Sequence, residues 1–138
     1  MSAFTLEIAT PERLLIREQV GEAQIPARQG EIGVRPEHAP LIAELGIGVL
    51  SYVANGLQRE LSVSGGVVEV LPDRVRVLAD LAEHADEIDV KRAEESLRRA
   101  NERILNPKPG IDIARALNAM KRAQARLGAA GRPVGAGH

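Results

Sequence analysis

Two copies of one short pattern carry the sharpest chemical signal in the sequence. The first is Ile88-Asp89-Val90-Lys91-Arg92-Ala93, and the second is Ile111-Asp112-Ile113-Ala114-Arg115-Ala116. An aspartate just before a helix is a good N-cap, because its side chain accepts a hydrogen bond from a backbone N–H of the first turn. An arginine guanidinium also suits phosphate oxygens. The residues alone therefore favour two helix starts, with phosphate binding by the first copy as the alternative.

The charges of the chain are unevenly distributed. Residues 1–84 carry 12 acidic residues and 7 arginines, whereas residues 85–138 carry 7 acidic residues and 11 lysines or arginines. No acidic residue follows Asp112. A basic C-terminal arm suggests an acidic or phosphate-bearing partner, and a solvated helix face is the simpler interpretation.

The sequence contains no recognisable motif of a catalytic or metal-binding site. His38, His84 and His138 are far apart and lack metal-ligand spacing, and there is no cysteine. The glycines match neither phosphate-loop pattern, so they are interpreted as turn and bulge residues. A small hydrolase that used Asp89 or Glu83 would need a nucleophile–base pair or a metal cluster, and neither is visible. We therefore expect a non-catalytic protein that requires no cofactor.

Composition excludes two further classes. The only aromatic residues are Phe4 and Tyr52, which argues against stacking on single-stranded nucleic acid. No apolar run approaches the length that crosses a bilayer, and the first residues lack the basic and apolar regions of a signal peptide. We expect the chain to reach a membrane only through a partner.

The chain divides into two parts with different periodicity. Up to about Asp80 it consists of short β runs, such as residues 4–8, which alternate apolar and polar side chains. Asn55-Gly56 predicts a two-residue hairpin turn, and Pro72-Asp73 predicts another turn. Many short strands with closely spaced turns predict an all-β sandwich or flattened barrel of about ten strands over residues 1–84.

A helical hairpin is expected over residues 87–128. Its first helix has a narrow apolar stripe, Val90, Ala93, Leu97, Ala100 and Ile104. Residues 106–110 contain two prolines and stop this helix. The second helix has the stripe Ala116, Met120, Ala123 and Leu127 and is expected to end at Gly128, before a disordered tail at 129–138. The stripes are rich in alanine, so we expect the hairpin to be held loosely.

Three segments together resemble the epsilon subunit of bacterial F-type ATP synthases. Residues 29–41 and 61–70 are similar to glycine-bearing segments of that family's N-terminal sandwich, and residues 88–93 look like its nucleotide-binding motif. The resemblance covers roughly residues 1–128. It implies an α+β fold, with a β-sandwich followed by an antiparallel helical hairpin.

The resemblance also implies a function in the central stalk of the rotary enzyme. The sandwich would pack on the gamma subunit and on the c-ring, so that torque passes between ring and shaft. The hairpin would be a switch that permits turnover when folded beside the sandwich. When extended, it would reach the catalytic alpha and beta subunits and inhibit ATP hydrolysis. The complex would place this chain peripherally, on the cytoplasmic face of the bacterial cell membrane.

The resemblance assigns roles to particular residues. The loop from Glu31 to His38 would face the c-ring, with Glu37 in place of a common glycine. Lys121, Arg122 and Arg126 would make the inhibitory contacts to the catalytic head. ATP would be a regulatory ligand of residues in both helices and at the end of the sandwich: Glu83, Ile88, Asp89, Arg92, Ala93, Arg99, Arg122 and Arg126. The alternative is a free-standing adaptor whose basic hairpin binds an acidic protein or nucleic acid.

Overall fold

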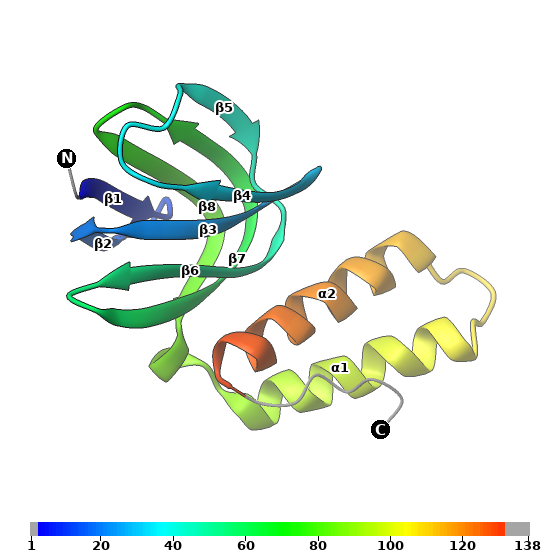
Figure 1. The fold of residues 1–138 in the computed structure, drawn as a ribbon. Helices are drawn as coiled ribbons and strands as arrows, with labels where there is room; N and C mark the ends of the chain where they lie inside the picture. The colour runs from blue at the N-terminus through cyan, green and yellow to red at the C-terminus, as the bar shows by residue number, and fades with distance from the viewer. Residues whose placement is uncertain (1–2, 132–138) are drawn as a thin grey trace.

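The computed structural model describes residues 3–131, which form a β-sandwich followed by two helices (Figure 1). The strands are β1 (Phe4–Ala9), β2 (Leu14–Val20), β3 (Glu22–Ala27), β4 (Gly30–Val34), β5 (Leu41–Glu44), β6 (Ile47–Ala54), β7 (Leu57–Val70) and β8 (Arg74–His84). A short 3₁₀ helix, η1 (Ala85–Glu87), leads to α1 (Val90–Leu105) and α2 (Ile113–Ala129). The α+β fold expected from the sequence is confirmed.

The strands pair in the order β2-β1-β8-β7-β6-β3-β4, and β5 also pairs with β7. The β1–β8 pair is parallel, and the remaining strand pairs are antiparallel. Strand β7 joins the two layers, because residues 57–64 pair with β6 while residues 67–70 pair with β5. This long strand therefore folds one sheet over itself to enclose a core.

The described residues form eight strands, where the sequence predicted about ten. One reason is that β7 runs through Gly65 and Gly66 without a break, so the β runs on either side of these glycines form a single strand. Gly65 and Gly66 have φ values of +70° and +122°, which only glycine adopts readily. A Cβ on Gly66 would lie 1.9 Å from the backbone oxygen of Leu78. These glycines bend one strand across a close neighbour.

The predicted turns are confirmed, and the core is aliphatic. Asn55 and Gly56 have φ values of +53° and +76°, as a two-residue hairpin turn between β6 and β7 requires. The sandwich core consists of buried aliphatic side chains and the two aromatics. Its largest fully buried members are Leu6, Ile8, Ile25, Leu50 and Leu61.

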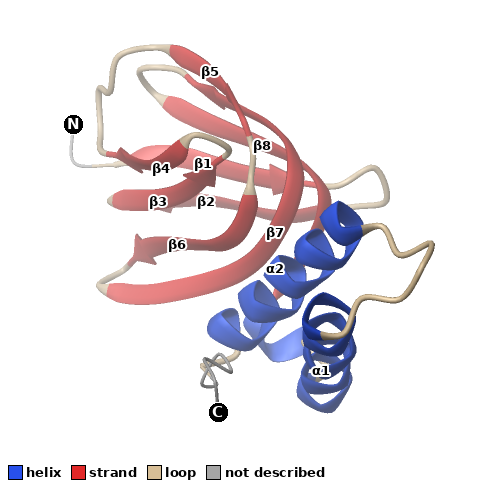
Figure 2. Cartoon of the chain, turned by 90° about the vertical axis from the view of Figure 1, so that its right-hand side faces the viewer, coloured by secondary structure: helices blue, strands red, loops and turns tan. Residues whose placement is uncertain are grey.

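The two helices form a hairpin in which only α2 lies against the sheet. Helix α2 packs over β6 and β7 on one side and against α1 on the other (Figure 2). Ala93 and Leu97 of α1 form a small apolar cluster with Ala123 and Leu127 of α2. This cluster confirms the centre of both predicted stripes, whereas Val90 and Met120 at its edge are only partly buried.

The second helix is longer than the sequence indicated. It continues through Gly128 to Ala129, and the residue with a positive φ that follows it is Gly131. Gly128 stays helical, and a Cβ there would lie 3.2 Å from Cγ2 of Val49 in β6. Its small size therefore serves close packing on the sheet rather than termination of the helix. The predicted disordered tail begins too early at 129, and residues 132–138 lie outside the described part of the chain.

Candidate functional site

Both copies of the aspartate–arginine pattern begin a helix in the same way. The Asp89 side chain accepts a hydrogen bond from the Arg92 backbone N–H at 3.1 Å, and Asp112 accepts one from the Arg115 N–H at 3.0 Å. These contacts satisfy first-turn N–H groups that have no partner within the helix. The interpretation as helix N-caps is confirmed for both copies. Nucleotide binding by the first copy stays a prediction.

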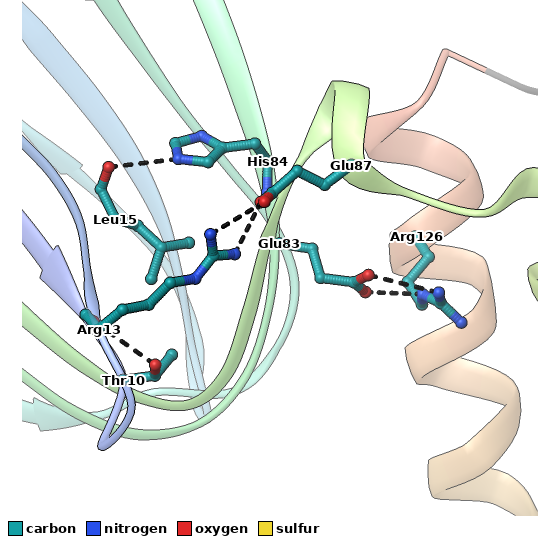
Figure 3. Close-up of polar contacts among 7 residues, drawn as sticks. All are labelled: Thr10, Arg13, Leu15, Glu83, His84, Glu87 and Arg126. Atoms are coloured by element: carbon teal, nitrogen blue, oxygen red, sulfur yellow. Dashed lines mark hydrogen bonds and ion pairs between the residues drawn. The ribbon is translucent and has the colours of Figure 1, made fainter.

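Two of the predicted nucleotide contacts meet directly in the structure. Glu83 lies near the end of β8, and Arg126 lies in the last turn of α2 (Figure 3). The Arg126 Nε atom is 2.7 Å from Glu83 Oε1, and its Nη2 atom donates a 3.4 Å hydrogen bond to Oε2. The pair is partly buried, with side-chain exposures of 21% for Arg126 and 34% for Glu83. It ties the helical hairpin to the sandwich.

The other predicted arginines lie further along the hairpin. Arg92 and Arg99 are exposed on α1, where Arg99 Nη1 is 3.8 Å from Glu95 Oε1. Arg122 of α2 lines a surface hollow of about 480 Å³, together with Arg103 and Arg115. Arg99 lines a different hollow near the loop between the helices. The structure thus brings Glu83 and Arg126 together and places Arg99 and Arg122 at separate hollows.

The apolar members of the predicted site are packed into the fold. Ile88 is 8% exposed, and Ala93 is fully buried in the cluster between the helices. A larger side chain at position 93 would push the helices apart, because protein interiors are close-packed. Ala93 therefore has a structural role whether or not a nucleotide binds beside it.

The structure contains a second polar cluster that the sequence did not indicate. Arg13, in the turn between β1 and β2, donates two hydrogen bonds to Glu87, of 2.9 Å to Oε2 and 2.8 Å to Oε1 (Figure 3). Glu87 also accepts the backbone N–H of His84 at 3.0 Å, and His84 Nε2 lies 3.2 Å from the Leu15 carbonyl oxygen. We call these four residues the linker clamp. It fixes the residues between β8 and α1 to the edge of the sandwich.

The electrostatics of the linker clamp are favourable. The hydrogen bonds from Arg13, and then the backbone N–H of His84, lower the pKa of Glu87 from 4.5 to about 2. Hydrogen bonding to Glu87 likewise raises the pKa of Arg13. Both groups are therefore charged at neutral pH. Arg13 and Glu87 are 74 residues apart in sequence, so no local spacing could have revealed the contact.

In the segment predicted to face a c-ring, the turn that follows β4 lies on the side of the sandwich away from the helices (Figure 1). Glu31 is exposed in β4, and His38 follows in the turn before β5, with its Nδ1 atom 2.8 Å from the Ala39 carbonyl oxygen. Glu37 in this turn has a φ of +64°. A positive φ at that residue explains why glycine suits the position, since a side chain is strained there.

The described residues offer no metal centre, since no three of their histidine, aspartate and glutamate side chains gather in one place. Within the same part of the chain, neither helix has the length and apolar character needed to cross a bilayer. The charged groups that do come together are ion pairs between arginine and glutamate. Ion pairs of this kind serve to bind charged groups and to hold one element against another.

Comparison with known protein families shows which family the chain belongs to. Residues 3–85 match the family described as "ATP synthase, Delta/Epsilon chain, beta-sandwich domain". Residues 86–131 match the companion family, "ATP synthase, Delta/Epsilon chain, long alpha-helix domain". The chain belongs to the ATP synthase epsilon chain family. The resemblance to the epsilon family seen in the sequence is thereby confirmed.

Curated relatives agree with this assignment over nearly their whole length. The ATP synthase epsilon chain of Solibacter usitatus is 58% identical over 125 residues, which cover 91% of this chain and 93% of that protein. The epsilon chain of Syntrophomonas wolfei is 43% identical over 134 residues, which cover 96% and 98% of the two chains. The matches include the helices as well as the sandwich, which a free-standing adaptor has no reason to share.

Solved structures share the fold at lower identity. A chain of the Euglena gracilis mitochondrial ATP synthase, from a structure of OSCP, F1 and c-ring, has a TM-score of 0.81 and 21% identity. The match covers 96% of this epsilon chain and 83% of that one. A chain of the Tetrahymena thermophila central stalk and c-ring has a TM-score of 0.59 and 12% identity, with 92% and 96% covered. These likenesses concern the fold alone.

Proposed function

We propose that this chain is the central-stalk epsilon subunit of a bacterial rotary ATP synthase. In this proposal it links the c-ring to the gamma shaft through its sandwich and restrains ATP hydrolysis through a mobile hairpin. The observation that carries the proposal is the match of both the sandwich and the helices to the epsilon family. The chain is then a regulatory subunit, and the catalytic chemistry belongs to other subunits.

The outer face of the sandwich offers a surface for gamma. Val67 of β7 pairs across the strands with Leu78 of β8, and both side chains are substantially exposed, at 43% and 56%. Ile42 in the neighbouring strand β5 is 74% exposed. Large apolar side chains that gather on one sheet face are typical of a protein interface. We assign this face to gamma and the separate Glu31–His38 loop to the c-ring.

The hairpin has the properties expected of a switch. Its packing on the sandwich runs mainly through α2, and the buried residues of α2 are mostly alanines. Such residues bury little apolar area, so the docked state gains only modest hydrophobic stabilisation. Lys121, Arg122 and Arg126 carry positive charge along the same helix, which suits an acidic surface on the alpha and beta subunits. Arg126 would have to leave Glu83 to reach it.

Bound ATP would act as a regulatory ligand of the folded hairpin. The predicted contacts lie on both helices, so a nucleotide that touched all of them would favour the paired arrangement. A ligand shifts a two-state equilibrium only by its differential affinity for the two states. Arg126 is already paired with Glu83, so a phosphate group would compete with that carboxylate. Calorimetry of the isolated chain tests this role, and no heat at millimolar ATP would overturn it.

The membrane association would follow from assembly. In this proposal the chain sits on the cytoplasmic face of the cell membrane, peripherally, because the c-ring and gamma hold it there. It needs no nucleic acid and no metal of its own. The contacts it makes with gamma are constant, whereas the contacts with alpha and beta form only when the hairpin extends.

Reconstitution of the rotary complex tests the whole proposal. The full chain should co-purify with gamma, and Leu78→Glu should weaken that binding because it places a charge in an apolar contact. Lys121→Glu with Arg122→Glu should raise ATPase activity of the complex. A matched double reversal, Lys91→Glu with Lys108→Glu, should leave inhibition unchanged. Absence of gamma binding by the wild-type chain would overturn the proposal.

A further inference from the structure

The hairpin packs on the sandwich through small side chains of α2, which contacts β6 and β7. Ala123 and Leu127 of α2 face the cluster shared with α1, whereas Ala125 and Ala129 are buried outside that cluster. Ala129 borders a hollow lined by Tyr52 and His84 of the sandwich. The side of α2 that faces the sheet is thus built from small residues. A directional polar contact on this side of α2 therefore adds to a docking surface of modest apolar area.

Within residues 3–131, one ion pair joins a helix of the hairpin to a strand of the sandwich, and it is Glu83–Arg126. Partial burial reduces the screening of such a pair by water and salt. The Arg126 Nε atom is itself buried, and no acceptor lies in line with its N–H although Glu83 Oε1 is 2.7 Å away. Removal of the Glu83 charge would therefore leave a partly buried guanidinium without its counter-ion, which is costly.

The position of the pair makes it sensitive to hairpin movement. Glu83 is held in β8 by pairing with Ser62 of β7, and the linker clamp fixes the residues that follow it. Arg126 lies near the end of α2, 43 residues later. If α2 left the sheet, Arg126 would move with it while Glu83 stayed. The ion pair thus exists only when the hairpin is docked.

We propose that Glu83 and Arg126 form a latch that holds the hairpin on the sandwich when no nucleotide is bound. The latch is a property of the isolated chain, and its regulatory consequence rests on the mobile hairpin proposed above. Arg126 has three candidate partners: Glu83, a nucleotide phosphate and an acidic surface of the catalytic head. The Arg126 guanidinium can pair with only one of these partners at a time. Release of Glu83 is then the first step of both nucleotide capture and extension.

Thiol labelling of the full chain measures the docking equilibrium directly. The chain contains no cysteine, so Ala129→Cys introduces a single thiol at a position that is 4% exposed and faces the sandwich. When undocking is fast compared with labelling, the labelling rate is proportional to the undocked population. The rate should be measured in this background for wild type, Glu83→Gln, Arg126→Gln and the double variant, without nucleotide.

We expect each single variant to label about fivefold faster than wild type, as a partly buried ion pair predicts. The double variant should label no faster than the faster single variant, because both changes remove one interaction. A matched cycle with Glu95→Gln and Arg98→Gln should leave labelling unchanged. That ion pair has an N–O distance of 2.6 Å but lies within α1.

Three results would overturn the latch. The first is labelling of both single variants within twofold of wild type. The second is a double variant whose acceleration equals the product of the two single accelerations. The third is an acceleration in every variant that matches its loss of global stability, measured by circular dichroism in denaturant. These results would leave the proposed function standing. Conversely, a complex that lacks inhibition by the wild-type chain would remove the proposed switch and leave the latch intact.

Discussion

The linker clamp gives the fold a pH dependence that can be worked out from one carboxylate. The pKa of Glu87 falls from 4.5 to about 2 when the chain folds, first because of the Arg13 hydrogen bonds. A pKa that is lowered in the folded state contributes stability above the unfolded value, and that contribution is lost as the pH falls through the folded value. The clamp should therefore stabilise the chain above about pH 4.5 and lose its contribution between about pH 4.5 and pH 2.

The size of this contribution follows from the shift and the exposure of the pair. At about 1.4 kcal/mol for each pKa unit, the full shift corresponds to roughly 3 kcal/mol. The side chains of Arg13 and Glu87 are 48% and 36% exposed, so water and salt screen much of it. We expect Glu87→Gln to lower the free energy of unfolding by about 1 kcal/mol at pH 7.

Urea unfolding at a series of pH values tests this expectation. The difference between wild type and Glu87→Gln should fall to less than half its neutral value by about pH 3, because the carboxylate is then largely protonated in the unfolded chain, which folding must deprotonate. Glu94→Gln is a matched control, since Glu94 is an exposed α1 residue with no ion pair among the described residues. Equal stability of wild type and Glu87→Gln at pH 7, or a difference that does not vary with pH, would refute the reasoning.

Three further predictions concern backbone geometry and hairpin docking. Gly66→Ala should cost about 3 kcal/mol or more in urea unfolding, because its Cβ would overlap a backbone oxygen; a loss below about 1 kcal/mol would contradict the close approach. Glu37→Gly should stabilise by about 0.5 kcal/mol, since φ is +64° there; a lower melting temperature would count against it. Val49→Cys with Gly128→Cys should form a disulfide that abolishes inhibition in the reconstituted complex until it is reduced; full inhibition by the oxidised chain would exclude a moving hairpin.

The elements of the fold were predictable where local sequence decides them. Asp89 and Asp112 cap helices because an aspartate side chain can reach the N–H three residues later, and Asn55-Gly56 turns the chain because both residues tolerate positive φ. Gly65-Gly66 misled the prediction for a physical reason. A glycine pair is compatible with a turn or with a bent strand, and the neighbouring backbone of β8 keeps these two glycines within one strand.

The contacts that connect the sandwich to the helical hairpin and its linker could not be predicted from the sequence. Glu83 and Arg126 were both named for the candidate site, but their direct pairing depends on how α2 lies across the sheet. The Arg13–Glu87 contact depends on where the β1–β2 turn meets the linker. Tertiary structure decides which charges meet.

The same contacts explain how one chain can hold a stable sandwich and a releasable hairpin. The sandwich buries a continuous aliphatic core, so it resists local opening. The hairpin docks through small residues and one ion pair, so its docked and undocked states can lie within a few kcal/mol of each other. A ligand that must shift such an equilibrium from 1:99 to 99:1 needs about 5.5 kcal/mol of differential binding. In the proposed scheme a bound nucleotide and the Glu83–Arg126 latch both favour the docked hairpin, so extension requires that Arg126 be free of both before it reaches the catalytic head.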